Sequence, residues 1–232
     1  MILGIPLSWI QDLHEQIHRN FLTDNAIGLL LHGFQNTLVI FLFGAIWAFA
    51  LATFLTYLNI NKKWQWLYRP LQWFVATIHD VPAVVLMMFF YYVVFSDSLN
   101  GIVVSIIALG VYTSGSLSRI FKIHIDQVGT EQYEAGKMLG FSSRQIYRLI
   151  ILPQAFKNML PLVIGEMKVL LRATSYAGYV AQKDLVKAVD TIRTQTEDVF
   201  VPLLFISLIY LFLSWLIVKG LHLLNVKLFC HD

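Results

Sequence analysis

The sequence predicts an all-α, polytopic membrane protein with about five transmembrane helices and one long polar loop on the cytoplasmic side. Of its 232 residues, 57% are hydrophobic and 13% are charged, whereas soluble domains carry about 25% charged residues. Several apolar stretches reach the roughly 20 residues that a helix needs to cross a bilayer. Lysine and arginine are also concentrated in alternate loops, as the positive-inside rule predicts for a membrane protein.

Five stretches are long and apolar enough to be transmembrane helices, and they cover about residues 28–58, 71–95, 101–118, 160–180 and 199–221. The first contains no charged residue over its whole length. We therefore expect one transmembrane domain over residues 27–222, preceded by an N-terminal segment (1–26) and followed by a tail (223–232). The N-terminal segment lacks the basic start of a cleaved signal peptide and is expected to form a short amphipathic helix with a linker.

The distribution of basic residues predicts the orientation of the chain. The loops after the first and third stretches, together with the tail, contain eleven lysines and arginines, and the opposite side contains four. Because basic residues are retained in the cytoplasm, the N-terminus is expected outside and the C-terminus inside. An odd number of spans requires the same arrangement.

Composition also excludes several classes of function. The net charge is only +3 and no basic block is present, so nucleic acid is not an expected partner. The single cysteine, Cys230, has no internal partner for a disulfide. The seven histidines show no metal-ligand spacing, so no bound metal is expected.

The segment from 129 to 153 is too polar to cross the membrane, and its sequence predicts two short helices on the cytoplasmic face. Thr130 is expected to cap the first helix, whose first turn contains Glu131 and Glu134. Gly140 is expected to end that helix, and Ser142 to cap the second. Apolar residues recur at helical spacing on both sides of Gly140.

This loop resembles the signature of type I ABC importer permeases, which reads E-A-A, three residues, G, nine residues, I, one residue, L-P. The chain has Glu134-Ala135-Gly136, Gly140 after three residues, and Ile150 to Pro153 after nine more, so every spacing matches. The one departure is Gly136 in place of the second alanine. The resemblance implies that this loop couples the chain to an ATPase through a set of its residues: Gln132, Glu134, Ala135, Gly136, Gly140 and Pro153.

Further segments resemble the polar amino-acid uptake branch of that family (His, Gln, Glu and Arg type). The segment 32–38 resembles the branch's G-x-x-x-T-L, and 171–177 resembles its L-x-K-x-T-S-L-A. Three positions depart from the branch. The segment 79–82 reads H-D-V-P instead of R-G-T-P, Arg119 stands in place of an acid, and Arg172-Ala173 stands in place of K-D. These positions lie along the expected translocation route, so the resemblance leaves the identity of the solute open.

The resemblance implies a set of partners and a location. It implies a bacterial inner-membrane protein whose segment 1–26 is periplasmic and whose tail is cytoplasmic. A second permease chain, identical or different, would complete the pathway, and a periplasmic or lipid-anchored solute-binding protein would deliver the solute. ATP and magnesium would bind separate ATPase subunits, so this chain is expected to hold no cofactor, to have no catalytic residue and to contact membrane lipid.

Ionisable residues inside the expected spans are candidates for the substrate pathway, because a charge in lipid costs at least ~2.5 kcal/mol. Five residues qualify: His79, Asp80, Glu166, Lys168 and Arg172. Asp80, Glu166 and Arg172 are the residues we select. Lys168 and Arg172 share a helix face, suited to a substrate carboxylate or to Asp80. The alternative is that these groups snorkel to water or pair only to hold the spans together. Pro82 and Pro161 could break or kink two of the spans. Such breaks often line a transport path, but they are equally compatible with simple packing kinks.

Three other functions are alternatives. A secondary transporter would need no ATPase, and the absence of internal repeats together with the loop signature argues against it. An intramembrane enzyme is disfavoured because the sequence contains no H-E-x-x-H, G-x-S-x-G or P-loop. A permease of the same architecture for another solute, such as methionine or an opine, remains open.

Overall fold

Helices make up every regular element that the structure describes, which confirms the predicted all-α class. The computed structural model describes residues 15–21, 25–96, 98–180 and 182–229. After a helical segment at 15–21, the elements in chain order are α2 (Ala26–Ile60), η1 (Lys62–Trp64), α3 (Gln65–Asp80), α4 (Ala83–Phe89), η2 (Phe90–Val94), α5 (Gly101–Gln127), α6 (Thr130–Met138), α7 (Ser143–Ile146), η3 (Tyr147–Ile151), α8 (Leu152–Ala173), η4 (Thr174–Val180), α9 (Leu185–Thr196) and α10 (Phe200–Phe229). Of the predicted N-terminal segment 1–26, the structure describes residues 15–21 and 25–26, and Cys230 lies outside the described residues.

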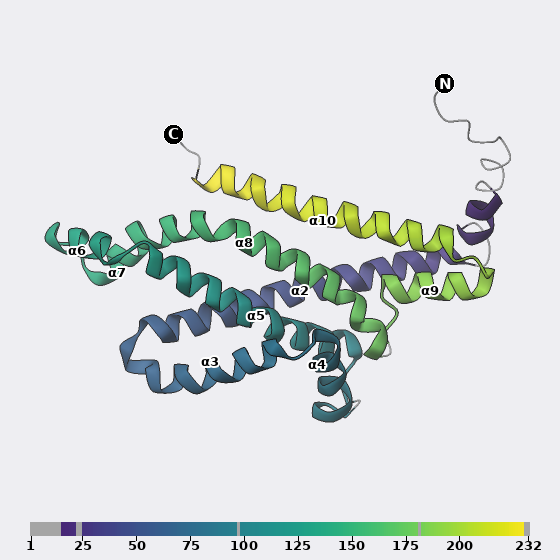
Figure 1. Cartoon of the computed structure of the whole chain (residues 1–232), viewed down its shortest axis with the longest axis horizontal. Coiled ribbons are helices and arrows are strands. Elements are labelled where there is room, and N and C mark those ends of the chain that lie inside the picture. The colour runs from purple at the N-terminus through teal and green to yellow at the C-terminus, as the bar shows by residue number, and fades with distance from the viewer. Residues whose placement is uncertain (1–14, 22–24, 97, 181, 230–232) are drawn as a thin grey trace, which may run out of the picture.

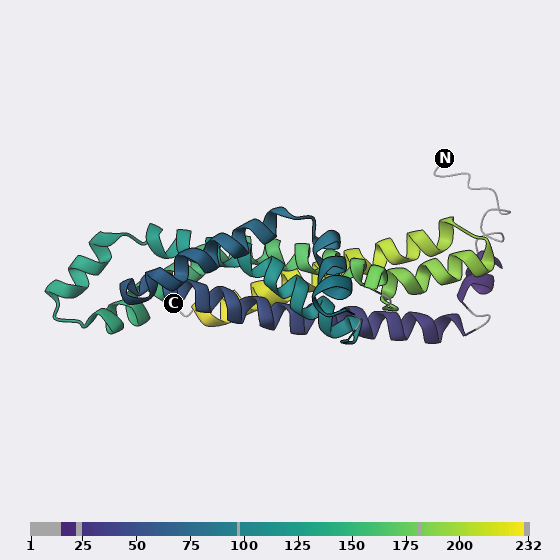
Figure 2. The ribbon, with the colours of Figure 1, turned by 90° about the horizontal axis from the view of Figure 1, so that it is seen from below.

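The long helices lie roughly side by side in an elongated bundle (Figures 1 and 2). The short helices α6 and α7 form one end of this bundle. The helical segment 15–21, α9 and the start of α10 form the opposite end. In the orientation that the basic residues predict, the α6–α7 end is cytoplasmic and the α9 end faces outward.

Three helices among the described residues are long and apolar enough to cross a membrane: α2, α5 and the part of α10 from Phe200 to Leu223. A fourth candidate is the pair formed by α3 and the α4–η2 segment, which is bent by 112°. The expected span at 160–180 corresponds to α8 and η4. The helix α8 begins at Leu152 and packs along α2, α5 and α10, although it contains several charged residues.

The break between α3 and α4 falls at Val81 and Pro82. Val81 has an extended backbone (φ −79°, ψ 137°), and Pro82 precedes the first residue of α4. This is the conformation that a following proline imposes on the residue before it. Pro161, by contrast, lies inside the continuous helix α8. Of the two prolines, Pro82 therefore marks a break in the chain's path and Pro161 does not.

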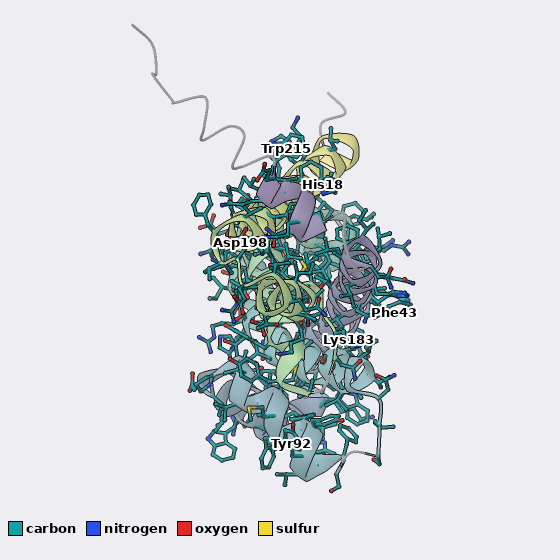
Figure 3. The ribbon with its side chains drawn as sticks, turned by 90° about the vertical axis from the view of Figure 1, so that its right-hand side faces the viewer. His18, Phe43, Tyr92, Lys183, Asp198 and Trp215 are labelled. Atoms are coloured by element: carbon teal, nitrogen blue, oxygen red, sulfur yellow. The ribbon has the colours of Figure 1, made fainter. Side chains whose placement is uncertain are left out.

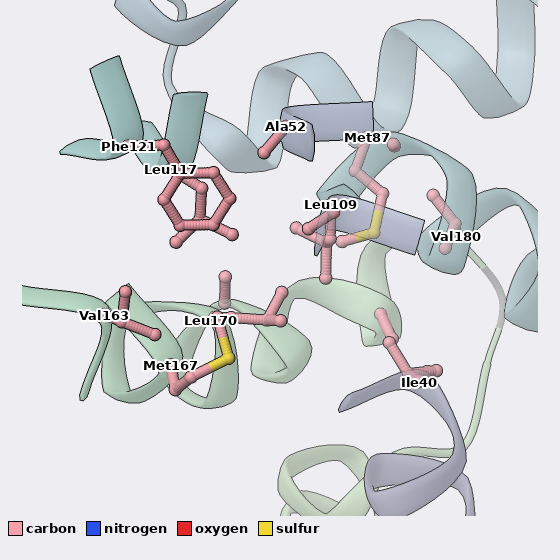
Figure 4. Close-up of a cluster of buried hydrophobic side chains, with 14 of the residues drawn as sticks. Ile40, Ala52, Met87, Leu109, Leu117, Phe121, Val163, Met167, Leu170 and Val180 are labelled. Carbon is pink, nitrogen blue, oxygen red and sulfur yellow. The ribbon is translucent and has the colours of Figure 1, made fainter. Parts of the chain in front are cut away.

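The apolar core is built around α5. In the most apolar stretch of α5, 61% of the residues are buried, compared with 22% in the corresponding stretch of α10. Leu109 and Leu117 of α5 are fully buried, and they belong to one cluster with Ile40 of α2, Met87 of α4 and Leu170 of α8 (Figure 4). Close approach of α2 requires a glycine on α5, because a Cβ on Gly110 would overlap the ring of Trp47. The helix α5 is thus the axis on which the other helices pack.

The α9 end of the bundle is held by a polar contact between residues far apart in the sequence. Asn20 Nδ2 donates to Asp198 Oδ2 (2.6 Å), and Thr196 Oγ1 donates to Asn20 Oδ1 (2.5 Å). Both Asn20 and Asp198 are buried. Phe21 packs on Phe205 with ring centroids 4.6 Å apart. Figure 3 looks onto this end, with His18 and Asp198 labelled. We call the contact among Asn20, Thr196 and Asp198 the outer latch.

Candidate functional site

The loop predicted to form two short helices does so, and its turn follows standard helix-capping geometry. Gly140 has a φ of +83°, a left-handed conformation that glycine adopts without strain. The N–H of Phe141 donates to the carbonyl of Gly136 (3.1 Å), and the N–H of Gly140 donates to that of Lys137 (3.0 Å). This pair of bonds is a Schellman motif, which closes a helix end. The predicted stop at Gly140 is therefore confirmed.

The caps of the two helices differ from each other in chemistry. Ser142 caps α7 as predicted, with a capping box in which Gln145 N–H donates to Ser142 Oγ (3.4 Å) and Ser142 N–H donates to Gln145 Oε1 (2.9 Å). The predicted cap at Thr130 is wrong. Thr130 is already the first residue of α6, and Gly129 precedes it with a φ of +88°, so no side chain caps this helix.

Gly136 is the buried residue of α6, and its missing side chain explains the departure from the E-A-A motif. A Cβ at this position would lie 2.8 Å from Ile146 Cγ1 and 3.2 Å from Ile146 Cδ1. Ile146 is fully buried beneath it. The two helices therefore pack at a distance that only glycine permits.

The other motif residues of α6 face outward. Gln132, Glu134 and Ala135 are exposed. At the tip of the loop, Met138 is 88% exposed and Leu139 is 75% exposed, more than any other large apolar side chain among the described residues. Such a patch on a polar loop is typical of a surface covered by a partner. Pro153 is also exposed and lies in the first turn of α8.

A second group of polar side chains lies inside the bundle, where α3, α5 and α8 meet. His79 of α3 donates from Nδ1 to the carbonyl oxygen of Tyr112 (3.2 Å), since a carbonyl only accepts. Its Nε2 lies 3.0 Å from Ser116 Oγ, and the carboxyl group of Glu166 on α8 lies near both side chains. The hydroxyl of Ser116, the imidazole of His79 and the carboxyl group of Glu166 are therefore neighbours, together with Tyr112. We call these four residues the bundle polar cluster.

Glycine again sets the approach of two helices at this cluster. A Cβ on Gly115 of α5 would lie 3.3 Å from the Cβ of His79 and 3.3 Å from the carbonyl oxygen of Val75. The imidazole of His79 also packs on the ring of Tyr112, with centroids 4.7 Å apart. The cluster is half-buried, so its polar groups are held by protein on one side and open on the other.

The residues predicted for the substrate pathway do not form a single site in the structure. Glu166 belongs to the bundle polar cluster, as does His79. Asp80 and Arg172 are exposed, and among the described residues no hydrogen bond or ion pair of their side chains joins them to that cluster or to each other. Lys168 is half-buried on α8. Tyr112 and Ser116 escaped sequence reasoning, because neutral hydroxyl residues in an apolar span give no charge signal.

The α9 end of the bundle carries a buried acid that sequence analysis did not single out. Asp184 is fully buried and caps α9, accepting from the N–H groups of Val186 (3.2 Å) and Lys187 (3.1 Å). Burial raises the pKa of Asp184 to about 6, although these hydrogen bonds act in the opposite direction. On the exposed side of α9, Asp190 pairs with Lys187 and Arg193.

Comparison with protein families gives a match over most of the chain. Residues 40–225 match the family model described as the binding-protein-dependent transport system inner membrane component. The chain is 28% identical over 215 residues to the probable glutamine ABC transporter permease protein GlnM of Bacillus subtilis (strain 168), covering 90% of this chain and 97% of the relative. It is 26% identical over 222 residues to the histidine/lysine/arginine/ornithine transport system permease protein HisM of Escherichia coli (strain K12), covering 90% and 92%.

Solved structures share the fold. A crystal structure of an amino acid ABC transporter with histidines superposes with a TM-score of 0.75 at 23% identity, over 87% of this chain and 95% of that chain. The MetNI methionine ABC transporter in an inward-facing conformation gives 0.72 at 18% identity, over 88% and 98%. At these identities the likeness concerns the fold alone.

Proposed function

The chain belongs to the family of binding-protein-dependent transport system inner membrane components, and from this premise we propose that it is the permease subunit of an ATP-driven importer for polar amino acids. In this proposal it forms half of a translocation pathway in the bacterial inner membrane. A second permease chain, ATPase subunits that bind ATP and magnesium, and a solute-binding protein complete the transporter.

The observation that carries the proposal is the exposed apolar tip at Met138 and Leu139, set directly beside the matched loop signature. Exposed apolar side chains of this size lose unfavourable contact with water when a partner covers them. The capped turn at Gly140 gives the tip a fixed shape, and α8 extends continuously from η3 into the bundle. A partner that moves the tip therefore moves α8 as well.

The bundle polar cluster supports a role in translocation. Polar groups at membrane depth are stable when they face protein or water and not lipid. The open side of His79 and Glu166 is therefore expected to face the second permease chain and the path between the two. Closure of the ATPases would then rock the two halves about this region, as in other alternating-access transporters.

The relatives support the substrate class. Their names specify glutamine, glutamate and aspartate, and histidine, lysine, arginine and ornithine. All of these are polar α-amino acids. Glu166 supplies a carboxyl group and His79 an imidazole, and the two lie close together beside Ser116. Groups of this kind bind polar solutes, and this pair is the proposed substrate contact.

The proposal is tested by purifying the chain in mild detergent and measuring both the ATPase that accompanies it and ATP-dependent uptake in proteoliposomes. We expect Met138→Asp to remove the ATPase and uptake together, because it places a charge in the covered patch. Arg144→Ser, at an exposed position among the nine unspecified residues of the motif, gives the same change in net charge and is the matched control; it should leave both unchanged. Wild-type chain that transports without an ATPase would refute the proposal. Competition by methionine alone, and not by polar amino acids, would favour the alternative substrate.

A further inference from the structure

The helix α3 exposes large aromatic side chains that belong neither to the coupling loop nor to the bundle polar cluster. Trp73 is 72% exposed and Trp66 is 71% exposed, more than any other large apolar side chain of the described residues apart from Met138 and Leu139. Because the two tryptophans are seven residues apart, about two helical turns separate them and both lie on one face. Contact of two indole rings with water is unfavourable, so this face is expected to be covered.

A basic side chain stands between the two tryptophans. Arg69 follows Trp66 by three residues and precedes Trp73 by four, so all three share the exposed face of α3. Arg69 is exposed, and it takes part in none of the ion pairs found in the described part of the chain, which lie on α9 at the other end of the bundle. We call Trp66, Arg69 and Trp73 the aromatic–arginine face.

The charge around this face is positive. Residues 25–79 contain no aspartate or glutamate, and Lys63, exposed in η1, adds a second basic group to Arg69. The first acid on the same face is Asp80, eleven residues beyond Arg69 and about 16 Å away along the helix. That distance exceeds the Debye length of about 8 Å at physiological ionic strength. Asp80 therefore does little to offset the charge of Arg69.

The opposite side of α3 is the side that packs on protein. Val75 and Ile78 are buried there, and Val75 lies against α5, where a Cβ on Gly115 would be 3.3 Å from its Cγ1. Asp126 of α5 lies near Tyr68, which belongs to the same side of α3 as Val75. The aromatic–arginine face therefore points away from α5 and toward the surroundings of the bundle.

The face lies near the cytoplasmic end of the bundle. The turn between α2 and α3 is directed toward the same end as α6 and α7 (Figure 1), which is the cytoplasmic end in the orientation that the basic residues predict. On α10, which runs toward that end, Lys219 Nζ lies 4.4 Å from the ring centroid of Trp215. Tryptophan beside lysine or arginine is typical of the level at which hydrocarbon meets phospholipid headgroups.

Chemistry selects the occupant of the face. Indole rings have an apolar body and a polar N–H, so they suit the boundary between acyl chains and headgroups. A guanidinium group forms paired hydrogen bonds to phosphate oxygens. Anionic lipids of the cytoplasmic leaflet also attract basic residues beside a membrane helix. A guanidinium group between two indole rings therefore suits a phospholipid with net negative charge.

We propose that the aromatic–arginine face binds an anionic phospholipid of the cytoplasmic leaflet, with the lipid phosphate on Arg69 and the acyl chains along Trp66 and Trp73. The site goes beyond the proposed function, because it requires neither an ATPase nor a transported solute. It anchors α3, the helix that carries His79 of the bundle polar cluster.

Quenching of tryptophan fluorescence by brominated lipid measures this site. The full chain is placed in phosphatidylcholine vesicles that contain brominated phosphatidylglycerol or, in parallel, brominated phosphatidylcholine, and the quenching gives the relative affinity for the two headgroups. We expect wild type to prefer the anionic lipid, and this preference to weaken as salt is added. Arg69→Gln should lower the preference about fivefold, because one basic residue near the headgroups is lost.

Matched variants test whether the effect belongs to this face. Arg69→Lys keeps the charge and should retain more of the preference than Arg69→Gln. Arg144→Gln removes an exposed arginine of α7, a helix without tryptophan, and should behave as wild type. Combining Trp66→Phe with Trp73→Phe should remove most of the headgroup-dependent quenching, because the tryptophans described elsewhere in the chain lie off this face. Equal preferences of wild type and Arg69→Gln, or undiminished quenching in the double variant, would overturn the proposal.

A crosslink identifies what covers the face. Benzoylphenylalanine in place of Trp73, in the full chain in its native membrane, should capture phospholipid that mass spectrometry identifies as anionic. Capture of a second permease chain or of an ATPase peptide in place of lipid would refute the assignment. The lipid site and the proposed function fail separately. Wild-type chain without an ATPase would refute the proposed function and leave the lipid preference intact, whereas loss of the preference alone would refute only the lipid site.

Discussion

Replacing Gly136 with alanine would restore the residue that the E-A-A motif carries, yet we expect it to weaken the packing of α6 on α7. The new Cβ would lie 2.8 Å from Ile146 Cγ1 and 3.4 Å from Ile150 Cδ1. Ile146 is fully buried and branched at Cβ, so its side chain has few alternative rotamers. The helices must therefore move apart by a few tenths of an ångström.

Two opposing effects determine how much Gly136→Ala changes the stability of the loop. Overpacking of this kind costs about 1–3 kcal/mol, and alanine gains about 1 kcal/mol over glycine in helix propensity. We expect a net loss of about 1 kcal/mol in the local stability of the loop, which corresponds to roughly fivefold more frequent opening. Hydrogen exchange of the amides in α6 measures this opening directly, and ATPase retention should fall in parallel.

A double-mutant cycle separates the clash from other effects. Ile146→Ala removes the atoms that the new Cβ would meet, so Gly136→Ala should be neutral or stabilising in the Ile146→Ala background, with a coupling energy of about 1 kcal/mol or more. Gly220→Ala in α10 is the matched control, because its Cβ would have no neighbour within 4 Å. If Gly136→Ala slows exchange in the wild-type background as well, the contact with Ile146 does not limit the packing and the reasoning is refuted.

Three further predictions follow from backbone geometry and burial. Gly140→Val should destabilise the loop by about 1–2 kcal/mol and remove most ATPase binding, because φ is +83° at this position. Gly140→Asn should have a smaller effect. Equal effects of the two variants on hydrogen exchange in α6 and on ATPase retention would contradict this. Asp184→Asn keeps the cap of α9 and removes a carboxyl group whose pKa in the folded protein is raised from 3.8 to about 6. The free energy of unfolding of the wild type should therefore fall by up to about 3 kcal/mol as pH rises from 4 to 6, and that of the variant should not. Parallel pH profiles of thermal unfolding for the two proteins would contradict this. Gly33→Ala should lower the unfolding temperature, because its Cβ would lie 2.8 Å from the carbonyl oxygen of Asp184, and Gly44→Ala, whose nearest neighbour would be 3.9 Å away, should not.

The features predicted from sequence are those that local rules govern. The stop at Gly140 and the cap at Ser142 depend on residues within one helical turn, and both were confirmed. The cap at Thr130 was predicted wrongly, since the sequence gives no sign that Gly129 takes a positive φ and that Thr130 is already helical. Local capping rules fix a helix end only when the preceding backbone is known as well.

The features that escaped prediction depend on contacts between distant residues. Glu166 was selected for its charge, but its neighbours His79 and Ser116 lie on two other helices. Asp80 was one of two partners considered for the face of Lys168 and Arg172, and no ion pair joins them among the described residues. A cavity lined by Tyr57, Asp126 and Tyr147 likewise takes its wall from three elements, α2, α5 and η3. Helix periodicity places a residue on a face, but only the packing of helices shows what that face meets.

The outer latch has a consequence for the order in which the chain is made. Asn20 is synthesised among the first residues, and its partner Asp198 follows 178 residues later. At about 5–20 residues per second, translation leaves the buried amide of Asn20 without this partner for roughly ten seconds or more. Until then Asn20 Nδ2 can bond only within its own segment, to the carbonyl oxygen of Gln16. A product that ends before Asp198 therefore lacks the polar contact that joins residues 15–21 to the segment between α9 and α10.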